Sequence, residues 1–448
     1  MSYGQSRLWL LDRLFPGDAV YNEVHALRLA GALDRRALAA ALDEIVRRHE
    51  ILRTRFEVRD GEPVQVVAAS PALDIVDEDL RGVPAASRTT EAESRLRDET
   101  RRPFALEQGP PVRVRLLQLA DDEHWFVVAM HHIVTDGWSV GVLWRELALC
   151  YDAFAAGRRP ALSALAEHYA DFALRQREWL AGPSLAPSLA YWKQRLDALA
   201  PLEIPTDHPR PAVADHAGGR MTFAVAAPVV QRLRAIARGS RATPFMALAA
   251  AFGVLLHRYG GQDDIALGVP VAGRTSPSLE PLIGFFVNML VLRTDFGGAP
   301  TFVELLGRVR ERALEAYEHQ QVPFERLVME LAPARDASRN PLFQASVALH
   351  GATASAWRMG GLRAEPLDAG ATSAKFDLAL TRVETGDGLR GSLDYASALF
   401  DAATAETLAA QYVELLGSIA ANPAERIGRL ALHDARARAS CLARAHGV

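Results

Sequence analysis

One stretch decides how this sequence folds: Met130-His131-His132-Ile133-Val134-Thr135-Asp136-Gly137-Trp138-Ser139. An apolar run at residues 125–130 leads into it, and its short length with aromatic and β-branched residues predicts a buried strand. Apolar residues at helical spacing follow it until Gly157, which predicts a helix. Two histidines, an aspartate and a glycine are therefore expected on a turn whose two flanks are held by packing.

The two histidines are expected to have different roles. Successive side chains at the end of a strand point to opposite faces, so one of His131 and His132 should face a cavity while the other packs inward. A neutral imidazole has one donor and one acceptor nitrogen and can take a proton from a nucleophile near neutral pH. No serine or cysteine nucleophile with its own base is apparent, so direct transfer between two substrates is the implied chemistry.

Asp136 and Gly137 complete the candidate site. Asp136 can anchor the turn through a buried cation or through backbone N–H groups. Gly137 allows close backbone approach, and the N–H groups at the start of the helix can stabilise an oxyanion. The same residues also have a structural interpretation, in which two satisfied core histidines precede an aspartate that only caps the helix.

The overall composition is that of a globular protein with more than one domain. The chain has 448 residues, 49% of them hydrophobic and 23% charged, which fits two or three domains. A net charge of −4 gives no electrostatic reason to expect nucleic acid or a membrane surface as a partner.

Cys150 and Cys441 have neither CxxC nor metal-ligand spacing, so no metal is expected. With no signal segment and no membrane-spanning apolar run, a cytoplasmic location is expected.

Mixed strands and helices without a βα repeat predict an α+β fold in two lobes. Four prolines between residues 201 and 211, followed by Gly218-Gly219, mark the expected boundary between the lobes. The expected parts are an N-terminal lobe carrying the histidine turn (1–180), inter-lobe helices with a proline-rich connection (181–219), a C-terminal lobe (220–425) and the start of a linker to a downstream domain (426–448).

Seven blocks, in order, resemble the signatures of condensation domains of nonribosomal peptide synthetases, over essentially the whole chain. These blocks are Ser2-Tyr3-Gly4-Gln5-Ser6-Arg7-Leu8-Trp9; Arg48-His49-Glu50-Ile51-Leu52-Arg53-Thr54-Arg55-Phe56; the HHxxxDG block from His131; Tyr169-Ala170-Asp171-Phe172-Ala173; Ile283-Gly284-Phe285-Phe286-Val287-Asn288; His319-Gln320-Gln321-Val322-Pro323-Phe324-Glu325; and Arg335-Asp336-Ala337-Ser338-Arg339-Asn340-Pro341-Leu342. A single such block is weak evidence, because several acyltransferase families share HHxxxDG, whereas seven in order are specific.

The resemblance implies a fold, a reaction and a set of partners. The fold would be two lobes similar to chloramphenicol acetyltransferase, forming a V-shaped pseudo-dimer with a central tunnel. Donor and acceptor peptidyl carrier domains would insert 4'-phosphopantetheine arms, and the acceptor α-amine would attack the donor aminoacyl or peptidyl thioester to form an amide. The domain itself would bind no cofactor, would be a monomer and would have an adenylation domain downstream.

The resemblance also assigns roles to residues of the turn. It implies that His132 lies at the reaction centre and that His131 and Asp136 hold the turn. In the family the aspartate pairs with an arginine of the second lobe, and Arg274 is the candidate here. We hypothesise that the Gly137 N–H lies near the thioester oxygen.

Four further residues are expected to meet the substrates. Trp138, Ser139 and Asn288 lie in blocks that line the tunnel in the family. Arg13, one helical turn from Trp9, is placed where a cation can meet a phosphopantetheine phosphate.

The opening block, the Arg48 block and residues 136–139 most resemble the class that joins an L-donor to an L-acceptor. A heterocyclising relative would carry aspartate in place of His131, and an inactive recruitment domain would have lost His132. Three alternatives remain: an epimerisation domain, a carrier-docking domain without catalysis, and a stand-alone acyltransferase that uses soluble thioesters.

Overall fold

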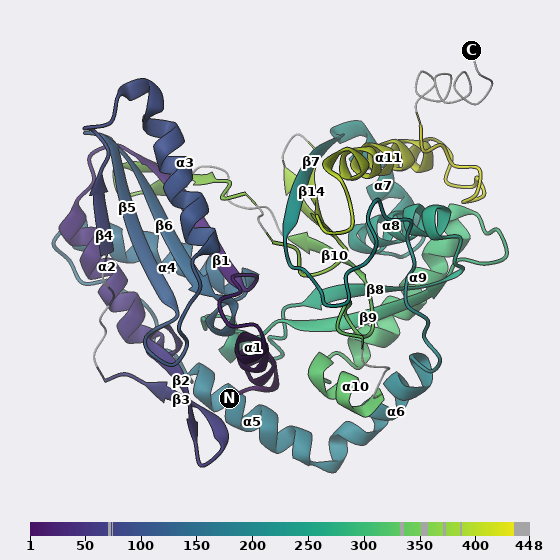
Figure 1. Cartoon of the computed structure of the whole chain (residues 1–448), viewed down its shortest axis with the longest axis horizontal. Helices are drawn as coiled ribbons and strands as arrows, with labels where there is room; N and C mark the ends of the chain where they lie inside the picture. The colour runs from purple at the N-terminus through teal and green to yellow at the C-terminus, as the bar shows by residue number, and fades with distance from the viewer. Residues whose placement is uncertain are drawn as a thin grey trace. The chain divides into compact units, whose positions relative to one another are not determined.

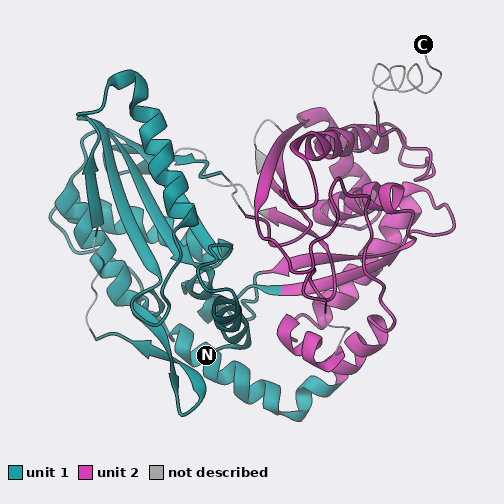
Figure 2. Cartoon of the chain, in the orientation of Figure 1, with its two compact units in different colours: residues 1–186, 272–288, 354–370 teal, residues 187–271, 289–353, 371–448 magenta. Residues whose placement is uncertain are grey.

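The chain forms two compact units, coloured separately in Figure 2. The computed structural model describes residues 1–69, 73, 75–331, 336–350, 357–370, 373–385 and 388–433. Unit 1 comprises Met1–Ala186, Ala272–Asn288 and Ala354–Gly370; unit 2 comprises Pro187–Val271, Met289–Thr353 and Ala371–Val448. Each unit has its own six-stranded sheet with helices against it, so the predicted α+β class is confirmed.

The sheet of unit 1 (Figure 1) has the strand order β11 (Trp357–Met359), β12 (Leu362–Leu367), β1 (Asn22–Ala30), β6 (Glu123–His131), β5 (Val112–Ala120), β4 (Ile75–Asp79). All neighbours are antiparallel except β4 and β5, which are parallel. A separate hairpin is formed by β2 (Thr54–Arg59) and β3 (Glu62–Val67). The helices are α1 (Tyr3–Leu14), α2 (Arg35–Arg48), α3 (Ala85–Arg101), α4 (Gly137–Ala155) and α5 (Tyr169–Ala181), with short 3₁₀ turns η1 (Glu50–Arg53), η2 (His132–Val134) and η4 (Pro277–Leu279).

Strand β6 is covered on both of its faces. Phe126, Val128 and Met130 belong to one apolar cluster, which also contains buried apolar residues of α2 and most of those of α4. Trp125 and Val127 belong to a second cluster, which contains the buried residues of α3. Every residue of β6 after Glu123 is therefore buried. This is the physical reason that its sequence is continuously apolar rather than alternating.

Unit 2 has a mixed sheet in the order β7 (Gly218–Ala226), β14 (Gly388–Ala396), β13 (Leu378–Thr385), β10 (Ala345–His350), β8 (Asp264–Val271), β9 (Asn288–Asp295). Its helices are α6 (Ala186–Arg195), α7 (Ala227–Gly239), α8 (Pro244–Gly260), α9 (Phe302–Glu318), α10 (Phe324–Leu331) and α11 (Ala402–Ala421). The 3₁₀ turn η3 (Pro183–Leu185) precedes α6 in the chain and belongs to unit 1. Eleven consecutive residues of α8, Met246–Leu256, are buried, so this apolar helix is a core helix of the unit.

The two units do not follow the contiguous lobes expected at 1–180 and 220–425. Residues 272–288 and 354–370 fall in the expected C-terminal lobe but pack with unit 1. The second of these segments supplies β12, which pairs with the edge of β1, and β11, which pairs with β12. The pairing joins residues more than 330 positions apart, a separation that local sequence patterns do not encode.

A linker was expected from residue 426, but the chain still packs with unit 2 at residues 427 and 430. Ile427 and Leu430 are buried, and the Ile427 N–H donates to the Pro300 carbonyl at 2.9 Å. Their apolar side chains hold this stretch against unit 2. Residues 434–448, which include Cys441, lie outside the described residues, as does Arg335 of the seventh block.

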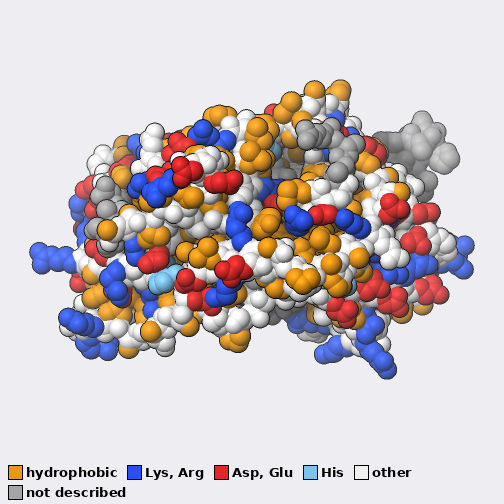
Figure 3. Space-filling model, turned by 90° about the horizontal axis from the view of Figure 1, so that it is seen from below, with side chains coloured by type: hydrophobic (Ala, Val, Ile, Leu, Met, Phe, Trp, Pro, Cys, Tyr) orange, Lys and Arg blue, Asp and Glu red, His pale blue; other side chains and the backbone are white. Residues whose placement is uncertain are grey.

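The described surface mixes charges of both signs. On the face drawn in Figure 3, basic and acidic side chains are interspersed with apolar ones. Among the described helices none alone is long and apolar enough to cross a membrane, and α7 with α8 reaches that length only as a pair bent by 104°.

A buried histidine links α2 to α4 and to the 272–288 segment. His49 is 2% exposed, and its Nε2 lies 2.8 Å from Glu146 Oε2. Its Nδ1 accepts from the Ile283 N–H at 3.4 Å, which places the ring proton of the neutral form on Nε2. Burial lowers the pKa of His49 below its usual 6.5, in spite of the opposing effect of Glu146.

This lowered pKa predicts that acid destabilises unit 1. Below pH 6.5 the unfolded chain binds a proton at residue 49 that the folded chain resists, so stability present above pH 6.5 is lost as the pH falls toward the lower folded pKa. The slope from one such group is at most about 1.4 kcal/mol per pH unit. Urea unfolding at pH 7.5 and 5.5 should show a larger loss for the wild type than for His49→Gln, whose amide keeps a donor and an acceptor without titrating. Equal losses of stability in the two proteins would show that His49 is not the cause of the acid sensitivity.

Candidate active site

His132 is held by its backbone and by one ring nitrogen. Strand β6 ends at His131 and the chain turns at once into η2, where the His132 N–H donates to the Tyr21 carbonyl at 2.8 Å. Nδ1 lies 2.7 Å from the Thr135 carbonyl oxygen. Because a carbonyl only accepts, Nδ1 carries the proton and Nε2 is the acceptor nitrogen of the neutral ring. Nε2 lies 3.6 Å from Glu23 Oε1, and the side chain is 17% exposed.

His131 faces the opposite way and is part of the core. It is 3% exposed, and its Nδ1 accepts from the Ile133 N–H at 3.1 Å, which caps η2. The rings of Tyr21 and Phe104 each lie 6.2 Å from its own. The structure thus places one histidine inside the unit and the other at an accessible position, as strand alternation predicts.

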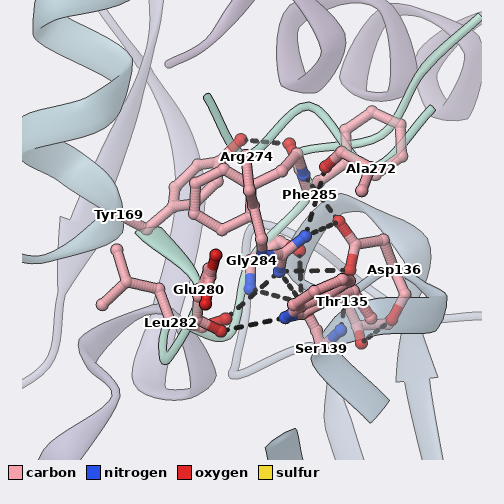
Figure 4. Close-up of polar contacts among 12 residues, drawn as sticks. Thr135, Asp136, Ser139, Tyr169, Ala272, Arg274, Glu280, Leu282, Gly284 and Phe285 are labelled. Atoms are coloured by element: carbon pink, nitrogen blue, oxygen red, sulfur yellow. Dashed lines mark hydrogen bonds and ion pairs between the residues drawn. The ribbon is translucent and has the colours of Figure 1, made fainter. Parts of the chain in front are cut away.

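Asp136 ties the turn to α4 and to the 272–288 segment (Figure 4). Its Oδ1 accepts from the Ser139 N–H at 2.8 Å, which makes it the N-cap of α4. Its Oδ2 accepts from the Phe286 N–H at 2.9 Å and lies 3.0 Å from Arg274 Nη1. The two charged side chains are 3% and 2% exposed, so this is a buried ion pair whose oxygens are also satisfied by backbone donors.

Arg274 contacts several parts of the site at once. Besides Asp136, its Nη2 donates to Ser139 Oγ at 2.8 Å and to the Leu282 carbonyl at 3.2 Å. The guanidinium lies 4.2 Å from the centre of the Phe286 ring. Gly273 has φ +65°, and a Cβ there would lie 1.9 Å from the Phe286 carbonyl oxygen, so only glycine fits. Arg274 belongs to unit 1, which corrects its expected origin in the second lobe.

Ser139 was expected to line a tunnel, but the structure contradicts this. The residue is 0% exposed. Its hydroxyl donates to the Gly284 carbonyl at 2.8 Å and accepts from the Gly284 N–H at 3.0 Å and from Arg274. One donor and two acceptor positions are therefore in use, and Ser139 instead holds the 272–288 segment against α4.

Gly137 and Trp138, which precede Ser139 in the turn, are exposed at the start of α4. Gly137 is the first residue of the helix, at the positive end of its dipole. Trp138 is 47% exposed, and its indole N–H donates to the Glu280 carbonyl at 2.9 Å. Both positions can meet a bound molecule, unlike Ser139.

Two other expected residues lie on β9 and α1. Asn288 is the half-buried first residue of β9. Arg13 lies in the last turn of α1, pairs with Glu107 at 2.5 Å and has its guanidinium 5.7 Å from the Trp9 ring. The Glu107 carboxylate partly neutralises the charge that was expected to meet a phosphate.

The sequence did not single out Phe285, although it lies in one of the seven blocks. Its ring packs edge-on against His132 with centroids 4.9 Å apart. The Tyr169 hydroxyl donates to the Phe285 carbonyl at 2.6 Å, as Figure 4 shows. Gly4 leaves room for the ring, since a Cβ there would lie 2.6 Å from it. Blocks from α1, α5 and residues 272–288 therefore meet around His132.

Two more neighbours of His132 carry no local signal in the sequence. Thr135 contributes only its carbonyl, which any residue has. Glu23 is the second residue of a different strand, 109 positions before His132, and lies next to it only because β1 pairs with β6.

The fold and the turn together define a class of protein. Two mixed sheets with an HHxxxDG turn at the end of a buried strand have the chloramphenicol acetyltransferase-like fold. The chain belongs to the condensation domain family, whose model matches residues 1–442. Condensation domains of nonribosomal peptide synthetases form amide bonds, an acyl transfer.

The relatives are large synthetases. The chain is 45% identical to one polypeptide of linear gramicidin synthase from Brevibacillus parabrevis over 435 residues, 96% of this chain and 6% of that protein. It is 44% identical to another polypeptide of the same synthase, over 99% of this chain and 9% of that protein. Among solved structures, the X-domain in the complex of the X-domain and OxyB from teicoplanin biosynthesis has a TM-score of 0.86 and 31% identity, covering 97% of this chain and 95% of that one. The chain thus spans less than a tenth of these two synthase polypeptides.

Proposed function

We propose that this chain catalyses attack of an acceptor aminoacyl α-amine on a donor aminoacyl or peptidyl thioester, forming an amide. The observation that carries the proposal is the orientation of His132. Its Nδ1 is fixed on the Thr135 carbonyl, which leaves Nε2 as the basic nitrogen on a partly exposed ring. A ring held in one tautomer and one direction needs little reorganisation when a proton arrives.

In the proposed mechanism His132 handles the proton of the amine. An α-ammonium has a pKa of about 8, so about a tenth is neutral at pH 7. As the amine nitrogen bonds to the thioester carbon, Nε2 takes its proton. When the carbon–sulfur bond breaks, that proton passes to the departing thiolate. The products are an amide and a free thiol, and no other reactant is required.

The start of α4 can stabilise the charge that develops on the thioester oxygen. Gly137 is exposed at the first position of a 19-residue helix, where N–H groups point outward and the helix dipole favours negative charge. We propose that the oxyanion forms here, with Asp136 and Arg274 holding the turn in place. This part of the proposal would be contradicted by a structure with both substrates bound in which the Gly137 N–H points away from the oxygen.

The substrates are proposed to arrive on carrier domains. Similarity to segments of linear gramicidin synthase supports delivery of both acyl groups as 4'-phosphopantetheine thioesters on peptidyl carriers. The pantetheine is therefore part of the substrates. The resemblance of the signature blocks supports an L-donor and an L-acceptor, and an adenylation domain downstream would load the acceptor.

The test is a condensation assay with two carriers. One carrier holds an L-dipeptidyl thioester and the other an L-aminoacyl thioester, and intact-mass spectrometry follows transfer of the dipeptidyl group. Appearance of a tripeptidyl acceptor supports condensation, and the reaction with the D-configured donor measures the stereochemical preference.

Three other outcomes would overturn the proposal. Loss of the donor α-proton in D₂O without peptide transfer would indicate an epimerisation domain. Carrier binding with neither reaction would indicate a docking domain. Transfer between free coenzyme A thioesters as efficient as transfer between carriers would indicate a stand-alone acyltransferase.

A further inference from the structure

A carboxylate from a neighbouring strand stands beside the basic nitrogen of His132. Glu23 Oε1 lies 3.6 Å from His132 Nε2, and the two side chains are 28% and 17% exposed. Both atoms are on the accessible side of the turn, in contrast to the buried pair of Asp136 and Arg274.

The pairing of β1 with β6 places Glu23 beside His132. Glu23 is the second residue of β1 and stands opposite Met130 in the antiparallel pairing with β6. The strand start is anchored on one side by the His132 N–H, which donates to the Tyr21 carbonyl. On the other side, Asn22 Nδ2 donates to the Arg102 carbonyl at 2.8 Å. Glu23 therefore occupies a position set by the sheet rather than by a loop.

The chemistry of the two groups fits a cation. A glutamate carboxylate is normally ionised near neutral pH and only accepts hydrogen bonds. Most of an α-amine near neutral pH is ammonium, which offers three donors. An ammonium that lies beside both groups can donate one N–H to the Glu23 carboxylate and another to His132 Nε2. A hydroxyl at the same place has one donor and no charge, and a methyl group has no donor.

We propose that Glu23 binds the α-ammonium of the acceptor and thereby makes this site specific for amine acceptors, an inference that rests on the proposed condensation function. The ammonium first gives one proton to water, and the neutral amine then attacks while Nε2 takes the second proton. The new nitrogen–carbon bond replaces the carbon–sulfur bond as described above. Glu23 stays ionised throughout and compensates the positive charge that His132 gains.

The test compares an acceptor that has the nitrogen with one that lacks it. Alanyl-loaded acceptor carrier is used as substrate, and propionyl-loaded carrier, which lacks only the amino group, as competitive inhibitor. Glu23→Gln is expected to raise KM for the alanyl carrier about tenfold, the size of a partly exposed charge-assisted hydrogen bond. The inhibition constant of the propionyl carrier should stay within about twofold of the wild-type value, and Glu23→Asp should recover part of the KM.

The matched control is Glu123→Gln. Glu123 has a similar exposure, 29%, and lies in the same strand pair, opposite Ala30. Ala30 is seven residues along β1 from Glu23, roughly 23 Å at the rise of an extended strand. This variant should keep the wild-type KM.

The outcomes separate this inference from the proposed function. An unchanged KM in a folded, condensing Glu23→Gln protein overturns the role of Glu23 alone. Equal weakening of alanyl and propionyl carriers also overturns it, because the effect would then be structural. Absence of any amide product from the wild type refutes the condensation function itself.

Discussion

Replacement of His132 by alanine should lower the rate of amide formation by roughly 10²- to 10⁴-fold, the range for loss of a positioned acid–base group. The change removes Nε2, the proposed proton acceptor, and the Nδ1 contact with Thr135. The measurement is single-turnover peptide transfer between loaded carriers. Carrier binding should stay near the wild-type value, because the change is confined to the turn.

A second substitution separates chemistry from geometry at the same position. In His132→Asn, the side-chain amide can still donate to the Thr135 carbonyl, but nothing replaces the basic Nε2. Asparagine should therefore be nearly as inactive as alanine. If asparagine retained most of the wild-type rate, His132 would only support the turn. His208→Ala, which changes a half-exposed histidine of unit 2, serves as the control.

The largest expected effect on stability comes from Arg274→Met. This change removes the cation but keeps much of the side-chain volume, and it leaves the Asp136 carboxylate buried with only its backbone donors. Breaking one side of a buried ion pair costs about 3–5 kcal/mol. Hydrogen exchange of peptides from β6 and α4 under increasing urea would report the loss of unit 1 stability.

The double variant tests whether the unpaired charge of Asp136 causes the loss of stability in Arg274→Met. Asp136→Asn combined with Arg274→Met leaves no unpaired charge at 2–3% exposure, so it should be more stable than Arg274→Met alone. If the double variant is less stable by the sum of the two single losses, the pair is not coupled. The cost would then come from the other contacts of Arg274, such as those with Ser139 and Leu282.

The local parts of the fold were predictable from sequence because their causes are local. The run before His131 is apolar at every position because β6 is covered on both faces, and α4 repeats its apolar residues at helical spacing. Strands β4, β11 and β12 carry no comparable local signal. Strand β11 has three residues, and β12 contains Pro366 and charged residues. What makes β12 a strand is its partner β1, more than 330 positions away.

The candidate site also has a part that the local sequence predicts and a part that only the fold reveals. The spacing of His131, His132 and Asp136 predicted the turn, and Asp136 does cap α4. Ser139 was misassigned because its exposure depends on the position of Gly284, which the local sequence does not reveal. Glu23 and Phe285 reach His132 from other parts of the chain, so only the fold reveals them as neighbours.

The attachment of β12 to the edge of β1 has a consequence for synthesis on the ribosome. Strands β1 and β6 can pair once residue 131 has emerged, but the second edge of β1 stays unpaired until residue 367 follows. At about 5–20 residues per second, those 236 residues take roughly 12–47 s. During that time a growing chain exposes a strand edge that can pair with another nascent chain. Fragments that end before β12 would keep that edge open permanently, so they should aggregate more readily than the whole domain.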